Sequence, residues 1–322
     1  MTARVTVIDY REPEVEEISF SSEEEWKQFR STGIGASEAA VVLGISPWQS
    51  PLSLYFQKRG EIPDQFENKQ MSMGKKLEAL VIEMYAEQTG RAVYPNKCIY
   101  RIPKKPHILA TPDAFTDENG GVEAKTAVYA GVKKWDDEVP IHYQAQAQHQ
   151  MLVLGWNWVD FPVLKSGVDF EIYRVERDEK VIRDIEAAVD RFWTQVQEGI
   201  APEADGHEAT SKALAAFYGS SDPDSVLECD PAVLEIVESL ERVKAKQKDL
   251  EESRAFFENR LKALLGKHEI ALVDGKKAFS WKVSERTGID VDGFRKAFPR
   301  ASKRFQKTTS VRTFRIHKME GK

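Results

Sequence analysis

The feature that most constrains the fold is a pair of short, β-favouring segments joined by turn residues. TPDAF occupies positions 111–115 and GVEAK occupies positions 121–125, with Asp-Glu-Asn-Gly between them. Turn residues between two such runs predict a β-hairpin. We therefore expect strands at 108–115 and 121–127, and a further strand at 92–102.

This hairpin carries three side chains that can take part in chemistry. Alternate side chains of a strand share a face, so Glu123 and Lys125 point the same way, and the neighbouring strand can bring Asp113 beside them. The two carboxylates and the carbonyl of Ala124 are hard oxygen ligands, suited to Mg²⁺ with Mn²⁺ as a substitute. Lys125 can orient or help deprotonate a water while countering charge on a phosphate. The alternative is an ion pair between exposed strands.

Two predicted helices direct polar side chains toward the same region. The helix at 72–88 carries Glu78 on its apolar arc, where a carboxylate needs a cation or a hydrogen-bond donor, unless it reaches solvent at the edge of the arc. The helix that follows Pro140 carries three polar residues on one narrow arc: Tyr143, Gln146 and Gln150. These can place neutral donors beside a metal-bound phosphate, although a solvated face is the ordinary explanation.

The order of the remaining elements predicts an α/β fold. Capping residues and apolar periodicity indicate several short helices and longer ones around these strands. The expected elements are short helices within 21–59, helices at 72–88, 140–154 and 178–198, and strands at 158–164 and 168–175. The alternation of helices and strands favours a central mixed sheet flanked by helices.

The domain organisation follows from shifts in composition. We expect an N-terminal extension at 1–20, a catalytic domain at 21–203, a linker at 204–229 and a C-terminal module at 230–322. The C-terminal module begins with a heptad seam from Ile236 to Leu264, which predicts a long helix that needs a partner. A small β module follows, with a hairpin at 273–276 and a strand ending in TFRIH.

Composition limits the possible functions. The 322 residues contain no apolar run long enough for a membrane span, and the N-terminus has no signal-like pattern, so we expect a cytoplasmic protein. Two cysteines are too few for a disulfide framework or an iron–sulfur cluster. The net charge of −6 disfavours nucleic acid if it is spread evenly, but residues 295–322 carry ten Lys or Arg against one Glu. That basic end is either a DNA contact or a solvated surface.

An ordered set of motifs resembles the YqaJ-type phage recombinase nucleases, relatives of lambda exonuclease in the PD-(D/E)xK superfamily. The resemblance covers roughly residues 20–202 and includes the segment from Trp135 to Gln146. The matching motifs are R-x4-GASEAAVVLG-x-SPW at 30–48, MGKKLE at 73–78, ATPDAF at 110–115, VEAKT at 122–126 and W-x4-P-x2-Y-x2-Q at 135–146.

The resemblance implies a PD-(D/E)xK core, followed here by a long helix and a small β module. It implies that Glu78, Asp113 and Glu123 hold a divalent metal, that Lys125 serves the attacking water, and that Gln146 with Tyr143 supports the site. It also implies that Arg30 and Ser37 bind a terminal 5′-phosphate. Arginine forks onto phosphate oxygens, and Ser37 lies near an expected helix start.

The resulting hypothesis is a Mg²⁺-dependent exonuclease that resects double-stranded DNA from 5′ ends for a companion single-strand annealing protein. A phage-type endonuclease shares the same catalytic centre and stays an alternative. A non-catalytic DNA-binding or assembly protein that uses the heptad helix ranks below both. The C-terminal module has no counterpart in compact toroidal exonucleases, so their trimeric ring and their processivity are not carried over. A homo-oligomer is one alternative, and the oligomeric state stays open.

Overall fold

The structure is a computed structural model that describes residues 4–8, 14–63, 69–135, 138–222, 225–285, 287–307 and 314. The chain divides into two units, Met1–Gly219 and Ser220–Lys322. The helices of the first unit are α1 (Glu23–Arg30), α2 (Ala36–Val42), α3 (Pro51–Lys58), α4 (Lys69–Thr89), α5 (Ile141–Leu154), α6 (Glu179–Glu198) and α7 (Glu208–Phe217), with a 3-10 helix η1 (Tyr129–Trp135).

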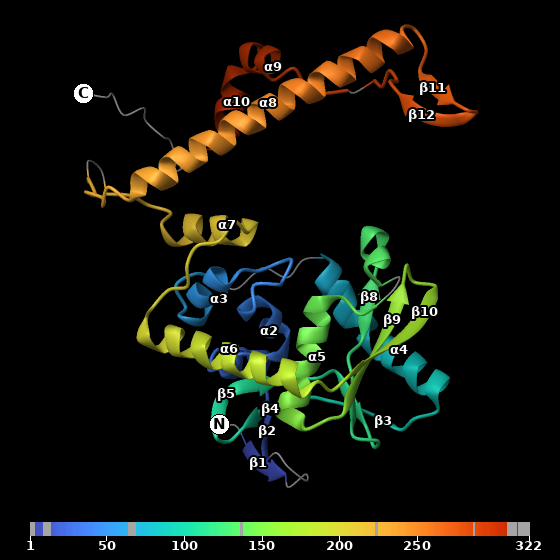
Figure 1. Cartoon of the computed structure of the whole chain (residues 1–322), viewed down its shortest axis with the longest axis vertical. Coiled ribbons are helices and arrows are strands. Elements are labelled where there is room, and N and C mark those ends of the chain that lie inside the picture. The colour runs from blue at the N-terminus through green and yellow to red at the C-terminus, as the bar shows by residue number, and fades with distance from the viewer. Residues whose placement is uncertain are drawn as a thin grey trace. The chain divides into compact units, whose positions relative to one another are not determined.

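A mixed sheet forms the centre of the first unit. Its strands are β3 (Val93–Pro95), β6 (Ala114–Thr116), β7 (Gly120–Val122), β8 (Lys125–Ala127), β9 (Trp158–Lys165) and β10 (Asp169–Glu176). The order is β10-β9-β7-β6-β3, and β8 also pairs with β9. Strands β7 and β8 run parallel to β9, whereas the other pairs are antiparallel. The expected α/β fold with a central mixed sheet is confirmed (Figure 1).

Helices cover both faces of this sheet. Along β9, Val159, Phe161 and Val163 pack with side chains of α5. On the opposite face, Tyr85 of α4 donates a hydrogen bond to Asp160. All eight residues of β9 are buried, which explains its nearly continuous apolar sequence.

A second sheet extends the first unit. It has the order β1-β2-β4-β5, with β1 (Arg4–Ile8), β2 (Val15–Ser19), β4 (Ile99–Ile102) and β5 (Lys105–Ala110). Within the expected N-terminal extension, β2 buries Val15 and Ile18, so this segment contributes to the folded unit. The expected single strand at 92–102 divides into β3 and β4, which belong to different sheets.

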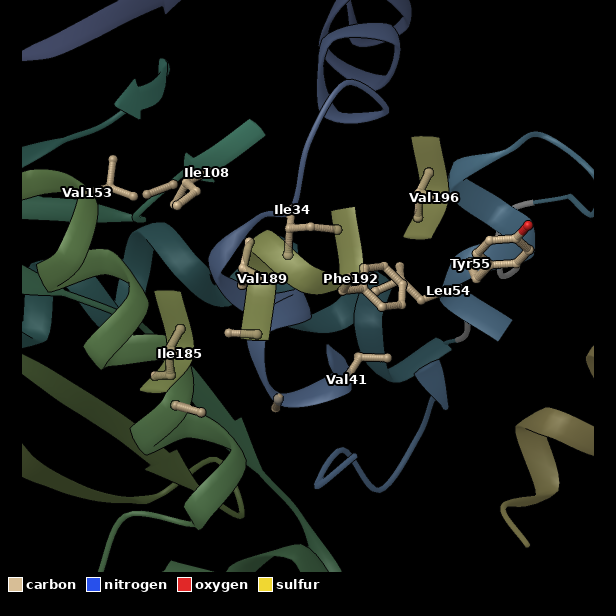
Figure 2. Packing of buried hydrophobic residues seen from close by; sticks show 14 of the residues in the cluster. Ile34, Val41, Leu54, Tyr55, Ile108, Val153, Ile185, Val189, Phe192 and Val196 are labelled. Atoms are coloured by element: carbon tan, nitrogen blue, oxygen red, sulfur yellow. The ribbon is translucent and has the colours of Figure 1, made fainter. Parts of the chain in front are cut away.

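The largest apolar cluster joins the short N-terminal helices to α5 and α6. Figure 2 shows Val189 and Phe192 of α6 packed with Ile34, Val41 and Leu54. The helix α6 begins at the N-cap Asp178 and ends at Gly199, whose φ of 74° suits glycine. The expected amphipathic helix at 178–198 is confirmed, and its apolar face packs against α2 and α5.

Residues 208–217 form α7, although they fall inside the expected linker. Ala209, Thr210 and Ala213 are buried, and the Thr210 hydroxyl donates to Ser50 Oγ at 2.7 Å. The ring of Phe217 stacks on Phe56 of α3. These contacts with α3 explain why an Ala- and Ser-rich segment becomes ordered against the first unit.

The second unit contains the long helix α8 (Val233–Leu265), as the heptad seam predicts. Strands β11 (Ile270–Val273) and β12 (Lys276–Ser280) form the expected hairpin, with positive φ at Asp274 and Gly275. Two short helices follow, α9 (Val291–Ala297) and α10 (Pro299–Arg304). The expected strand ending in TFRIH lies almost wholly outside the described residues. No described helix has the length and apolar character needed to cross a membrane.

Candidate active site

Asp113 lies in a break between two strands, not within one. Strand β5 ends at Ala110 and β6 begins at Ala114, so the expected strand at 108–115 is interrupted at Thr-Pro-Asp. Pro112 has no amide hydrogen for a strand ladder. Asn96 holds the break: its Nδ2 donates to the Pro112 carbonyl at 3.0 Å, and its main-chain N donates to the Asp113 carbonyl at 2.9 Å.

Glu123 also lies in a break, because the expected strand at 121–127 divides into β7 and β8. Its amide donates to the carbonyl of Asp160 on β9 at 2.9 Å. The residue is 4% exposed, so its charge needs partners inside the protein. Lys125 Nζ donates to Oε1 at 2.7 Å, Gln146 Nε2 donates to the same oxygen, and Gln150 Nε2 donates to Oε2 at 2.7 Å.

Lys125 is the cation of this cluster. Lys125 and Glu123, which were expected to lie side by side, form a 2.7 Å ion pair. Its Nζ also lies 4.9 Å from the centre of the Tyr143 ring, a cation–π distance. Burial acts to lower the pKa of Lys125, but Glu123 and Asp113 outweigh burial and raise it, so the residue is an ammonium.

Tyr143 and the two glutamines come from α5. Residues 146 and 150 are one turn apart and therefore lie above each other on the helix. Tyr143 is half-buried between Lys125 and the ring of Trp135. The centres of the Tyr143 and Trp135 rings are 5.3 Å apart. The polar arc predicted for this helix faces the site instead of solvent, and Gln146 and Gln150 are buried.

Excess negative charge characterises the site. Burial and then the charge of Glu123 raise the pKa of Asp113 well above its ordinary range. Burial and then Glu123 also raise the pKa of Glu78, which is half-buried on α4. Three carboxylates thus interact with one ammonium, and a divalent cation would relieve the repulsion between them.

The donor set fits a hard divalent cation, but its side chains do not surround a common point. Within the described part of the chain, no three Asp, Glu, His or Cys side chains stand close enough to hold a metal ion. Asp113 Oδ2 accepts from the amide of Ala124 at 2.9 Å, and both Glu123 oxygens accept from Lys125 or a glutamine. Carboxylate oxygens remain the ligands that Mg²⁺ prefers. The expected carbonyl ligand from Ala124 stays a prediction.

Arg30 and Ser37 lie together at the N-terminal end of α2. Arg30 Nη2 donates to Ser37 Oγ at 3.3 Å. The same guanidinium lies 3.4 Å from Glu38, which also pairs with Lys58 Nζ at 2.8 Å. Ser37 is exposed and Arg30 partly so, and the two side chains form an accessible polar surface.

Two residues that support the site received no role from the sequence: Asn96 and Asp160. Gln150 was predicted only as a neutral donor on the polar arc of the helix that follows Pro140. Gln150 lies on the predicted arc, one helical turn after Gln146. That spacing was the sequence signal that Gln150 faces the same site as Gln146. Asp160 is 1% exposed, and its carboxylate accepts from Arg174 at 2.6 and 2.8 Å and from the Tyr85 hydroxyl at 2.7 Å. No local pattern identifies Asn96 or Asp160, because their partners are distant in sequence.

Comparison with known proteins gives both a family and a relative that matches most of the chain. Residues 25–157 match the family described as YqaJ-like viral recombinase domain. The chain is 30% identical over 301 residues to the uncharacterized protein YqaJ of Bacillus subtilis (strain 168), which covers 92% of this chain and 94% of that protein.

Two solved structures show partial similarity. The alkaline exonuclease LHK-Exo from Laribacter hongkongensis is 24% identical, and the match covers 55% of this chain and 94% of that one with a TM-score of 0.46. A phage-related exonuclease from Haemophilus somnus 129PT is 13% identical, with coverage of 52% and 96% and a TM-score of 0.42.

Proposed function

Because the chain belongs to the family of YqaJ-like viral recombinase domains, we propose that it is a metal-dependent exonuclease resecting double-stranded DNA from 5′ ends. One observation carries the proposal. The buried pair of Glu123 and Lys125 lies in one electrostatic cluster with Asp113 and Glu78. Such a cluster combines ligands for a cation with a proton-handling group, as phosphodiester hydrolysis requires.

The carboxylates of Glu78, Asp113 and Glu123, with the Ala124 carbonyl, would hold Mg²⁺ or Mn²⁺. When bound, the metal would supply Lewis-acid stabilisation of the phosphate and lower the pKa of an attacking water. The chain's own residues fix the acids in place: the Ala124 amide orients Asp113, and two glutamines orient Glu123. Preorganised groups need no rearrangement during the reaction.

Lys125 supplies the positive charge that the developing phosphate charge requires. Its ammonium is anchored to Glu123 and covered on one side by the Tyr143 ring. Removal from water strengthens its attraction for an anion. In the proposal, Lys125 orients the attacking water and stabilises charge on the phosphate. The Tyr143 ring holds the Lys125 ammonium in place, and Gln146 holds the Glu123 carboxylate in place.

Arg30 and Ser37 would distinguish a DNA end from its interior. A guanidinium and a hydroxyl at 3.3 Å from each other can both donate to the oxygens of one phosphate. A terminal phosphate carries more negative charge than an internal phosphodiester, so such a pair of donors favours ends. This arrangement supports an exonuclease over an endonuclease.

The biological role in the proposal is phage-type recombination in the bacterial cytoplasm. Resection of one strand leaves a single strand, which a separate annealing protein would bind. In the proposal, residues 21–203 form the catalytic domain and the C-terminal module at 230–322 serves homo-oligomer assembly or DNA contact. The seam on α8 supports assembly, because Val243, Leu250 and Phe257 are all exposed.

Digestion of matched DNA forms tests the proposal. Linear duplex with 5′-phosphate ends, linear duplex with 5′-hydroxyl ends and closed circular duplex should be incubated with and without Mg²⁺. We expect loss of linear DNA only, faster with 5′-phosphate, and release of label first from the 5′ end. Nicking of closed circles would support the endonuclease instead. A lack of cleavage in every metal would contradict the nuclease mechanism.

A further inference from the structure

We infer that Gln150 is a positioning residue that fixes the Glu123 carboxylate for binding of a divalent cation, an inference that rests on the proposed function. Its Nε2 donates to Glu123 Oε2 at 2.7 Å, whereas Lys125 and Gln146 both donate to Oε1. Gln150 is therefore the donor that holds the second oxygen. With both oxygens held, the carboxylate plane has one orientation.

The burial of Gln150 makes a surface role impossible. Its side chain is 0% exposed and lies on the face of α5 that meets the sheet. An amide there must leave water, which is unfavourable unless both of its ends find partners. Among the described residues, Oε1 of Gln150 has no hydrogen-bond partner. An apolar side chain would fill this position without that penalty, so packing alone does not explain the glutamine.

The orientation of the amide follows from charge. Rotating the amide by half a turn would place its oxygen against the Glu123 carboxylate, and two acceptors would repel each other. Gln150 therefore gives its donor to Glu123 and leaves its acceptor unpaired. The contact with Glu123 determines how this residue is placed.

Groups that hold a metal ligand from behind contribute strongly to metal affinity. They fix the ligand's orientation before binding, and their loss typically costs 10- to 100-fold in affinity. Glu123 retains about one free lone pair for a cation, because a carboxylate accepts about four hydrogen bonds or metal contacts and three donors already contact it. Gln150 thus acts through Glu123 and needs no contact with DNA.

The test compares Gln150→Met with Gln148→Met in the whole 322-residue chain. Methionine keeps the unbranched shape but removes the donor. Gln148 lies on the same helix and is also buried, but its amide binds the Glu176 carbonyl at 2.7 Å and the Asp178 amide at 2.9 Å, outside the site. Mn²⁺ binding without DNA is measured from the electron paramagnetic resonance signal of the free ion, and melting temperature reports folding.

We expect Gln150→Met to weaken Mn²⁺ binding by about 10-fold or more. Gln148→Met should lower the melting temperature and leave Mn²⁺ affinity unchanged within about twofold. Equal affinity of folded Gln150→Met and the unmodified protein overturns the inference but not the nuclease proposal. Failure of the unmodified protein to bind Mn²⁺ overturns both.

A second variant covers the case in which Gln150→Met does not fold. Gln150→Asn keeps an amide but shortens the side chain by one methylene, so the donor no longer reaches Glu123 Oε2. It should show the same loss of Mn²⁺ affinity. Retained affinity in folded Gln150→Asn would likewise overturn the positioning role.

Discussion

The Nζ atom of Lys125 lies 2.7 Å from Oε1 of Glu123, and the two side chains expose only 17% and 5% of their area. Water screens such a pair weakly, so each partner strongly affects the charge of the other. Glu123 has two further donors, Gln146 and Gln150, whereas Lys125 has the Tyr143 ring. The ion pair is therefore the electrostatic centre of the site.

Replacing Lys125 by Met tests the role of the ammonium. We expect the single-turnover cleavage rate to fall by roughly 10²- to 10⁴-fold, the usual contribution of a proton-transferring or charge-stabilising group. Folding should be retained, because both glutamines still donate to Glu123. Lys134→Met, at an exposed lysine of η1, is the control and should cleave normally. Unchanged cleavage in Lys125→Met would favour a non-catalytic DNA-binding protein.

Replacing Arg30 by Gln tests the recognition of DNA ends. The ratio of kcat/KM for 5′-phosphate and 5′-hydroxyl duplexes should fall by about 10-fold or more, since hydrogen bonds to charged groups contribute about 1.5–3 kcal/mol. Ser37→Ala should reduce the same ratio less, because it removes one neutral donor. Arg59→Gln removes an arginine paired with Glu61 and should leave the ratio unchanged. If Arg30→Gln lowers both rates equally, this arginine does not read the phosphate.

The buried His149 predicts a pH dependence of stability. Burial lowers its pKa from 6.5 to about 4, and its Nε2 donates to the Leu109 carbonyl at 3.0 Å as a neutral ring. Between pH 6.5 and about pH 4, His149 binds a proton in the unfolded chain but not in the folded chain. The free energy of unfolding therefore falls as the pH decreases from about 6.5 to about 4. The contribution of His149 is about 3 kcal/mol, and it is fully present above about pH 6.5.

Urea unfolding at pH 7.5 and pH 5 measures this effect. His149→Gln retains a donor for Leu109 but cannot titrate, so it should lose less stability between the two pH values than the unmodified protein. His268→Gln alters an exposed histidine and should behave like the unmodified protein. An identical pH dependence for all three would show that His149 is not the group responsible. Burial also lowers the pKa of His142 to about 4, which adds to the same trend.

The exposed seam of α8 predicts self-association. Leu250 is 71% exposed at a seam position, and Leu250→Glu would place a charge in a packed interface. We expect the unmodified protein to sediment as an oligomer and Leu250→Glu to shift toward the monomer. Ala245→Glu adds the same charge outside the seam and should keep the oligomer. A monomeric unmodified protein would rule out assembly through this seam.

The residues with local signals could be predicted from the sequence. Capping residues and apolar periodicity located the helices α3, α5 and α6, because these signals lie within a few residues of each element. Strand alternation predicted that Glu123 and Lys125 lie side by side, and their ion pair agrees, although Glu123 itself lies between two strands. The strand breaks at Asp113 and Glu123 were not predicted, since Asn96 and Asp160, which hold these segments, belong to other strands or loops.

The sequence by itself determined which acids and which lysine are available, the order of their motifs and the helices and strands that carry them. Tertiary structure decided that Gln150 meets Glu123, that the Asp160 main chain holds the Glu123 amide, and that α7 packs on α3. The physical reason is the range of the interactions. Periodicity specifies which face of an element is buried, whereas the partner of a buried polar group depends on distant segments brought together by the core.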